Sequence, residues 1–241
     1  ILSNAFNSAI INFDKESKTD KTSVNLPLAK ISNLIIVKTK AASIVLKENT
    51  NLKSSIIPDM VRFKMAPPST KIDSPINLIW FGMHSNHDSL FQELQNINNL
   101  GFKVNLKVVT NFSNEFKSLL VINYKNIKFK IIEWQTDFYK EIISSNVVII
   151  PYPKDKERLV KSSNRIIDSI NLGKFVILSD VKQFIEFKEF SYYGDIAQGL
   201  KWLKYNTDKI EIIVKNAQNH VSKNYSQEAV SNLWKKTIEE V

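Results

Sequence analysis

The segment 161–177, KSSNRIIDSINLGKFVI, places basic and polar side chains just ahead of an apolar helical run. A helix start exposes unpaired N–H groups and a partial positive charge, and both attract anions. At helical spacing, Lys161, Arg165 and Asp168 share one side of this predicted helix. The two cations suit a diphosphate, and Asp168, one turn deeper, suits ribose hydroxyls. We therefore expect this helix to hold a phosphate group at its start.

An ordinary structural explanation of the same residues stays open. Ser162 or Ser163 would cap the helix, and Lys161 would be solvated. Arg165 would then pair with Asp168, three positions later on the same helix. Under this explanation the segment binds no ligand.

The first strand of the regular part of the chain ends in Gly82, and His84 follows two residues later. A glycine lets the main chain approach a ligand closely, and the imidazole suits a phosphate or a sugar. The loop does not read GxGxxG, so a dinucleotide-binding fingerprint is absent. The alternative for His84 is a solvated loop side chain.

Other predicted strand ends carry aromatic, amide and acidic side chains. Trp134 and Gln135 suit stacking on a base and reading its edge, although Trp134 also fits a partly buried core. Tyr152 lies in the sequence PYP (151–153), which predicts a rigid wall or simply the end of a strand. Asp180 and Glu186 suit sugar hydroxyls, and surface acids are also common at such positions.

Composition excludes several kinds of chemistry. The chain has 241 residues, 43% of them hydrophobic, so it can bury a core. It has no cysteine, which excludes disulfides, thiolate catalysis and zinc–sulfur sites. Its three histidines leave little room for a histidine metal site. Serine-hydrolase, HExxH, P-loop and EF-hand patterns are absent.

The formal net charge is +9. A basic surface suits nucleic acid, anionic lipid or phosphorylated ligands. The lysines are scattered singly, however. A genome rich in A and T, which favours codons for Lys, Asn and Ile, explains them equally well. No stretch approaches the roughly 20 apolar residues of a membrane span. The chain begins at Ile1 without a methionine, which suggests a fragment.

Apolar runs alternate with amphipathic segments from residue 76 onward. This alternation predicts an α/β fold, a Rossmann-like parallel sheet with helices on both faces and ligands at the carboxyl ends of its strands. The strands are expected at 76–82, 103–110, 127–134, 147–151 and 174–179. The helices are expected at 87–101, 113–121 (with Ser113 as N-cap and Glu115 in the first turn), 136–145, within the segment 161–177, and from 194 onward.

The first third of the chain predicts part of another α/β unit. A helix and a strand are expected within 28–39, a helix at 40–49 and a strand at 54–60. The Pro- and Ser-containing segment 66–75 is the predicted linker. The expected organisation is a partial N-terminal α/β domain at 1–65, the linker, and a nucleotide-sugar-binding domain with C-terminal helices at 76–241.

Several of these segments, in their order, resemble the donor-binding half of GT-B glycosyltransferases of the family 4 and family 1 type. The segments SNVVIIPYP, IIDSINLGKFVILSD and the closing NAQNHVSKNYSQEAVSNLWKKTIEEV carry the resemblance, with Glu186 near the family's PE position. Residues 28–60 resemble the end of the family's N-terminal domain. The resemblance covers about residues 28–241.

This resemblance implies a nucleotide-diphosphate sugar as donor substrate. It places Asp168 at the ribose, Trp134 and Gln135 near the base, and a further set at the diphosphate: Gly82, Lys161, Ser163, Asn164 and Arg165. Such enzymes generally need no bound metal, because cationic side chains and a helix dipole stabilise the leaving diphosphate. The expected cofactor set is therefore empty.

The sequence departs from the family at one acidic position. The family's paired glutamates stand eight residues apart, and here the second corresponds to Asp168 whereas the first is Val160. The loop carrying Lys161 and Arg165 resembles that of divergent surface-polysaccharide transferases instead. The usual contact that orients the sugar is therefore not expected.

The resulting hypothesis is a metal-independent glycosyltransferase, truncated in this chain, with a glycan or lipid-linked acceptor. We expect a cytoplasmic protein, with peripheral contact to the anionic inner face of the membrane, and no nucleic-acid partner. A non-catalytic module that binds a nucleotide or nucleotide sugar on the same scaffold is the alternative, and the missing first acid favours it. A nucleic-acid-binding α/β protein would require clustered basic residues.

Overall fold

A six-stranded parallel sheet forms the centre of the computed structural model. The structure describes residues 32–69, 71–72, 74–112, 114, 116–117, 123–152 and 161–240. The strand order is β5-β4-β3-β6-β7-β8. The strands are β3 (Ile76–Phe81), β4 (Val104–Thr110), β5 (Ile127–Glu133), β6 (Val147–Ile150), β7 (Phe175–Leu178) and β8 (Tyr192–Tyr193). The predicted α/β class with a Rossmann-like parallel sheet is confirmed.

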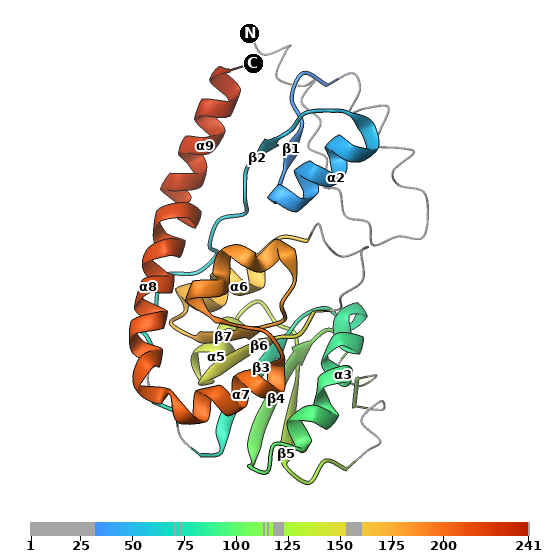
Figure 1. Ribbon diagram of the computed structural model, residues 1–241, viewed down its shortest axis with the longest axis vertical. Helices are drawn as coiled ribbons and strands as arrows, with labels where there is room; N and C mark the ends of the chain where they lie inside the picture. The colour runs from blue at the N-terminus through green and yellow to red at the C-terminus, as the bar shows by residue number, and fades with distance from the viewer. Residues whose placement is uncertain are drawn as a thin grey trace.

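Helices cover both faces of this sheet (Figure 1). The helices are α3 (His87–Asn98), α5 (Tyr139–Ile143), α6 (Asn164–Asn171), α7 (Ile196–Tyr205) and α8 (Thr207–Tyr225), with a 3-10 helix η2 at His84–Asn86 and another, η4, at Lys182–Phe190. Apolar residues of α3, α7 and the first half of α8 pack in one buried cluster with the sheet. Residues of α5, α6, η4 and the second half of α8 pack in a second cluster with its other face. Burial on both faces explains why the central strands read as continuous apolar runs.

A smaller α/β unit precedes the sheet. Strands β1 (Ile36–Val37) and β2 (Ser55–Ile56) pair in parallel, and α2 (Lys40–Thr50) connects them. The Thr39 hydroxyl caps α2 by accepting from the Ala42 N–H at 3.1 Å. The predicted helix at 40–49 is confirmed, and β1 and β2 lie within the segments 28–39 and 54–60 where strands were predicted, whereas residues 1–31 lie outside the described part of the chain.

Helix α9 (Gln227–Glu239) joins the small unit to the large one. Ser226 ends α8 and caps α9, so that the two helices run one after the other along the length of the molecule (Figure 1). Val230 of α9 packs in one cluster with Ile36 of β1 and Ile57, beside Trp234. The end of the chain thereby returns to the unit formed near its beginning.

Residues 58–69, which we call the connecting segment, run from the small unit across α6. The Val61 N–H donates to Tyr225 O at 2.9 Å, and the Ser69 N–H donates to Gly173 O at 2.8 Å. Gly173 has a φ of +73°, and a Cβ added there would lie 2.1 Å from Pro67 O. A glycine is therefore required where the connecting segment passes the end of α6. The division into domains at 66–75 stays a prediction.

Some predicted elements differ from the structure. Helix α5 starts three residues later than predicted, because residues 136–138 form a turn in which the Phe138 N–H donates to Gln135 O. The sequence did not predict η4 or the short β8. Most of the predicted helix at 113–121, including Ser113 and Glu115, lies outside the described residues.

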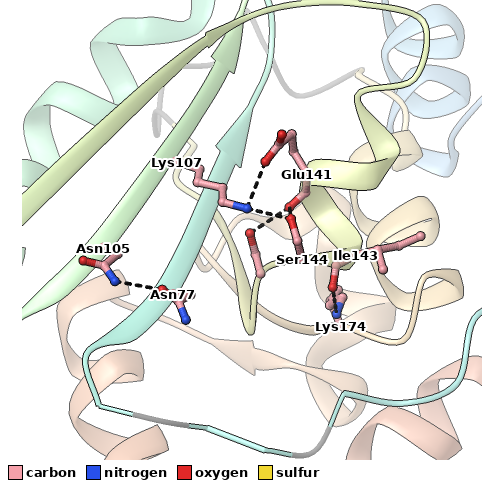
Figure 2. A network of polar contacts seen from close by, with 8 residues as sticks. Asn77, Asn105, Lys107, Glu141, Ile143, Ser144 and Lys174 are labelled. Atoms are coloured by element: carbon pink, nitrogen blue, oxygen red, sulfur yellow. Dashed lines mark hydrogen bonds and ion pairs between the residues drawn. The ribbon is translucent and has the colours of Figure 1, made fainter.

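Polar contacts fix α5 to β4 and to Lys174, which lies between α6 and β7 (Figure 2). The Lys107 ammonium pairs with the Glu141 carboxylate at 2.9 Å and donates to the Ser144 hydroxyl at 2.6 Å. Lys174, only 4% exposed, donates from its ammonium to Ile143 O at 2.7 Å. Burial, with the nearby charge of Lys107, lowers the pKa of Lys174 to about 8.

We expect the stability of the protein to carry a pH-dependent contribution from Lys174. Because its folded-state pKa lies below the unfolded value, the unfolded chain binds more protons between pH 8 and pH 10.5. The free energy of unfolding of the parent should therefore rise between pH 7.5 and pH 10, relative to that of Lys174→Met, by roughly 2 kcal/mol. Urea unfolding at a series of pH values measures it, and parallel curves for the two proteins would contradict the prediction.

Candidate functional site

The sheet changes its direction of winding between β3 and β6. The chain proceeds from β3 through β4 to β5 on one side, then returns to place β6, β7 and β8 on the other. The loops that leave β3 and β6 therefore diverge at the carboxyl edge of the sheet, and such a switch point forms a crevice that binds ligands in open α/β sheets. Gly82 follows β3 at this point, and α6 begins after β6.

The start of α6 is not capped by the serine before it. Ser163 takes the N-cap position, and its main-chain O accepts from Ile166 N at 2.9 Å and from Ile167 N at 3.0 Å. Among the described residues, however, its side chain makes no capping hydrogen bond. Asn164 Oδ1 is buried with no hydrogen-bond partner in that same part of the chain. The explanation by a Ser163 side-chain cap therefore does not hold, and the helix start keeps its capacity to bind an anion.

Arg165 belongs to α6, and its side chain extends to the end of β3. Its Nη1 donates to Phe81 O at 3.3 Å, and a Cβ added at Gly82 would lie 3.4 Å from the same nitrogen. Burial lowers the pKa of this guanidinium, yet an arginine side chain stays protonated in proteins. The structure thus brings Gly82 and Arg165 together, and the alternative in which Arg165 pairs with Asp168 is wrong.

Lys161 connects the loops on both sides of the crevice. Its Nζ donates to Asn86 Oδ1 at 3.1 Å, across 75 residues of sequence. His84, two residues before Asn86, donates its main-chain N–H to Asn111 Oδ1 at 2.7 Å and packs its ring 4.7 Å from that of His87. Within the described residues, His84 Nε2 is buried without a hydrogen-bond partner. Lys161 therefore joins the residues before α6 to η2, and the contacts of His84 are with Asn111, His87 and Phe112.

A cleft with a volume of about 860 Å³ opens beside the start of α6, between the large and the small unit. Ser163, Asn164 and Glu186 line it on the side of the large unit. Lys38, Thr39, Lys40, Ile44 and Ile56 line it on the side of the small unit. A ligand held at the start of α6 would therefore face groups of the small unit as well.

Glu186 lies on the wall of this cleft and already has a partner. The Tyr225 hydroxyl donates to its carboxylate. Burial, and then this hydrogen bond, raises the pKa of Tyr225. The neighbouring His220 stacks on Phe190 at 4.4 Å, and burial lowers its pKa. The role of Glu186 at sugar hydroxyls stays a prediction.

Asp168 makes contacts that the sequence did not predict. It is fully buried, and its Oδ1 accepts from the Arg62 main-chain N–H at 3.0 Å. Its Oδ2 accepts from Arg62 Nε at 2.7 Å and Nη2 at 2.6 Å. Burial raises the pKa of this carboxyl, whereas the charge and hydrogen bonds of Arg62 lower it. Asp168 therefore fixes the connecting segment to α6, and its contact with a ribose stays a prediction.

Trp134 and Gln135, the predicted base-binding pair, follow the end of β5, whereas the predicted wall at residues 151–153 stays a prediction. Trp134 is 46% exposed and packs on Phe138 at a centroid distance of 5.7 Å, while Gln135 is exposed beside it. Tyr152 is buried instead, packs edge-on against Phe184, and donates its N–H to Ser179 Oγ. Pro153 and Val160 lie outside the described residues.

Two residues near the site were missed from the sequence, Arg62 and Phe112. Arg62 carries no local signal, because its partner lies 106 residues away. Phe112 follows a predicted strand, but only the structure shows its positive φ of 56°. Within the described residues, no group of three or more His, Cys, Asp or Glu side chains is placed to hold a metal. No helix in that part of the chain has the length and apolar character to cross a membrane.

Comparison with known proteins establishes the fold. The sequence matches no protein-family model, and no curated protein gives a significant match. Solved structures do match: TarM at 16% identity and a TM-score of 0.65, over 95% of this chain and 48% of TarM. A glycosyltransferase from Rickettsia africae matches at 17% identity and a TM-score of 0.67, over 96% of this chain and 69% of that one.

Sucrose-phosphate synthase from Thermosynechococcus elongatus matches at 12% identity and a TM-score of 0.69, over 99% of this chain and 66% of that one. These neighbours are GT-B glycosyltransferases, so the chain has the GT-B fold that the sequence resemblance predicted. It spans about half the length of TarM.

We expect Arg62→Ala to destabilise the protein by about 2 kcal/mol, because it leaves the Asp168 carboxylate buried without its cation. The double variant Arg62→Ala/Asp168→Asn should recover part of that loss, since a neutral amide needs no countercharge and can still accept from the N–H of residue 62. Urea unfolding measures all three proteins.

Lys38→Ala serves as the matched control, since it removes an ion pair with Asp59 whose two side chains are 25% and 29% exposed. Such a pair contributes less than about 1 kcal/mol. A double variant less stable than Arg62→Ala alone would show that the Arg62–Asp168 contact is not what holds the connecting segment.

Proposed function

We propose that the protein binds a nucleotide-diphosphate sugar at the start of α6 and acts in a GT-B glycosyltransferase. The observation that carries this proposal is the meeting of three features at the switch point of the sheet. These are the uncapped start of α6, the Arg165 guanidinium and Gly82, the glycine after β3. A Cβ atom added to Gly82 would lie 3.4 Å from Nη1 of Arg165. Together the three features offer main-chain N–H groups and a permanent charge, and the missing Cβ of Gly82 lets the Trp80 ring and the Arg165 guanidinium pack against the end of β3.

Transfer of the sugar breaks the bond between its anomeric carbon and the diphosphate oxygen. The leaving diphosphate gains negative charge as this bond breaks. Arg165, Lys161 and the dipole of α6 are placed to stabilise that charge more strongly in the transition state than in the ground state. In this proposal a bound metal is not needed for the same task.

The remaining predicted residues take roles along the donor. Trp134 and Gln135 contact the base, and Asp168 lies near the ribose. His84, whose Nε2 has no hydrogen-bond partner among the described residues, contacts a phosphate or the sugar. Glu186, on the cleft wall, contacts sugar hydroxyls.

Ligands of the structural neighbours support this class of donor. A mutant of Staphylococcus aureus TarM, 15% identical to this chain, was solved in complex with UDP and alpha-GlcNAc-glycerol. A trehalose-6-phosphate protein from E. coli, 8% identical, was solved with UDP-2-fluoro glucose. These ligands belong to those proteins, and they support a nucleoside diphosphate as the part of the donor held here.

The acceptor, a glycan or a lipid-linked molecule of the surface-polysaccharide type, would enter from the side of the small unit. Lys38, Lys40 and apolar side chains of α2 and β2 line the cleft there. The net charge of +9 supports a place at the anionic inner face of a membrane.

A second candidate is a module that binds a nucleotide sugar without transferring it. Val160, at the position of the family's first acid, favours this candidate. It predicts donor binding without hydrolysis or transfer, so detectable release of the nucleoside diphosphate from a nucleotide sugar would exclude it.

We expect the protein to bind UDP or GDP in a calorimetric titration, and Lys161→Ala/Arg165→Ala to bind about 100-fold more weakly. The reason is that two charge-assisted hydrogen bonds to the diphosphate are lost. Arg165→Lys, which keeps the charge but not the planar fork, should recover part of the affinity.

Lys201→Ala is the matched control, because this lysine is exposed on α7, away from the cleft-lining residues. Thermal melts check that each variant is folded. Equal affinity of the parent and the folded double variant would contradict a diphosphate at the start of α6.

A further inference from the structure

Lysines gather on the neighbouring strands β4 and β5, in a group that we call the lysine surface. Lys107 lies in β4, Lys128 and Lys130 lie in β5, and the exposed Lys103 directly precedes β4. The register of the two strands places Lys107 opposite Lys130. Lys128 shares a face of the sheet with Lys130, because residues two positions apart in a strand point the same way. The lysines stand singly in the sequence, and the pairing of the strands brings them together.

The face of the sheet that carries these lysines is only partly covered. Strands of a parallel sheet are usually buried on both faces, yet Lys128 and Lys130 are exposed. The helix α5 has only five residues, and it contacts β4 through the ion pair between Glu141 and Lys107. The lysines of β5, the outermost strand on this side, therefore stay in contact with solvent.

The positive charge of the lysine surface is only partly compensated. Glu141 pairs with Lys107 at 2.9 Å. The hydrogen bond from Lys107, and the charges of Lys107 and Lys130, lower the pKa of the Glu141 carboxyl, so this single carboxylate serves both lysines. In the described part of the chain, Lys103 and Lys128 have no ion-pair partner. The surface therefore carries a net positive charge.

Protection of the edge of the sheet explains this charge only in part. Lysines on an edge strand hinder pairing with another chain, which would account for Lys128 and Lys130. It does not account for Lys107, because β4 is an inner strand, and like charges on facing strand positions lower stability. The buried Lys174 adds a further positive charge nearby, since the charge of Lys107 contributes, after burial, to lowering its pKa. Such an accumulation of cations indicates an anionic partner.

The residue types favour a lipid bilayer over a nucleic acid. A lysine ammonium on its flexible stem attracts an anionic surface without a fixed geometry, whereas arginine suits paired contacts to a phosphate. No arginine lies in β4, β5 or α5. The residues of β4 and β5 on this face include no aromatic ring that could stack on a base.

An exposed apolar side chain stands beside the lysines. Ile143, at the end of α5, is 44% exposed. Its main-chain O accepts from the Lys174 ammonium, and the hydroxyl of the next residue, Ser144, accepts from the Lys107 ammonium (Figure 2). An apolar side chain among cations suits the boundary between the headgroups and the hydrocarbon of a bilayer.

We propose that the lysine surface binds an anionic lipid bilayer. Groups of four or more lysines attract anionic headgroups in this way. The inference rests on the membrane contact within the proposed function, and it assigns that contact to β4, β5 and α5. The lysine surface extends from the amino ends of β4 and β5 to their midpoints, whereas the crevice lies at the carboxyl edge of the sheet. The protein can therefore bind a bilayer and a nucleoside diphosphate at the same time.

The test measures sedimentation of the protein with vesicles of phosphatidylcholine, either alone or mixed with phosphatidylglycerol. The parent should bind only the mixed vesicles, and added salt should release it. Lys128→Gln/Lys130→Gln should bind the mixed vesicles roughly 30-fold more weakly, because two cations near the headgroups are lost. Calorimetry should give the same UDP affinity for this variant as for the parent, and thermal melts check its fold.

Lys201→Gln/Lys235→Gln is the matched control, because it removes the same charge from exposed lysines of α7 and α9. It should bind vesicles as the parent does, and equal weakening in the two double variants would overturn the proposal. A parent that binds UDP but no mixed vesicles would also overturn it, while the donor site stands. Vesicle binding by a parent that binds neither UDP nor GDP would support the lysine surface and overturn the donor site.

Duplex DNA is titrated into the same proteins to separate the two kinds of anionic partner. The proposal predicts weaker binding to DNA than to the mixed vesicles. DNA binding that is tighter than vesicle binding, and that is lost in Lys128→Gln/Lys130→Gln, would assign the lysine surface to a nucleic acid and overturn the bilayer contact.

Discussion

The ion pair between the buried Asp168 carboxylate and the half-exposed Arg62 guanidinium is the contact on which the arrangement of the two units depends. A carboxylate in the fully buried middle of α6 needs compensation for its lost hydration. Arg62 provides this compensation by donating one main-chain and two guanidinium hydrogen bonds to the Asp168 carboxylate. Because Arg62 lies in the connecting segment, the same contact fixes the path of the chain from the small unit to the sheet. Phe63 and Phe138 lie beneath the guanidinium and complete its surroundings.

The candidate site depends on this arrangement indirectly, through α6 and the small unit. The helix that carries Asp168 also presents its uncapped start to the crevice, and the small unit forms the opposite wall of the cleft. The second tie between the units is α9, which packs Val230 against Ile36 and Ile57 (Figure 1). One tie lies in the connecting segment and the other on the small unit, and together they hold the small unit over the start of α6. Donor-binding groups and the opposite wall are thereby positioned by the same few contacts.

Much of the fold could be predicted from the sequence, because strands buried on both faces read as short apolar runs between amphipathic helices. The start of α6 was also predictable, since polar and basic residues gather there without any apolar pattern to explain them. The partner of Asp168 was not, because ion pairs across 106 residues leave no local signal. The same holds for η4, whose 3-10 geometry has no 3.6-residue period, and for Phe112, whose residue type argues against a left-handed backbone. Each of these was set by tertiary contacts.

The central claim is that a diphosphate binds at the start of α6, and a crystal structure of the protein with UDP or GDP tests it most directly. The account predicts diphosphate oxygens about 3 Å from the first N–H groups of α6 and from the Arg165 guanidinium. The diphosphate should lie next to Gly82, in the crevice between the ends of β3 and β6. A nucleotide bound elsewhere on the molecule, or one whose diphosphate points away from α6 into solvent, would contradict the account.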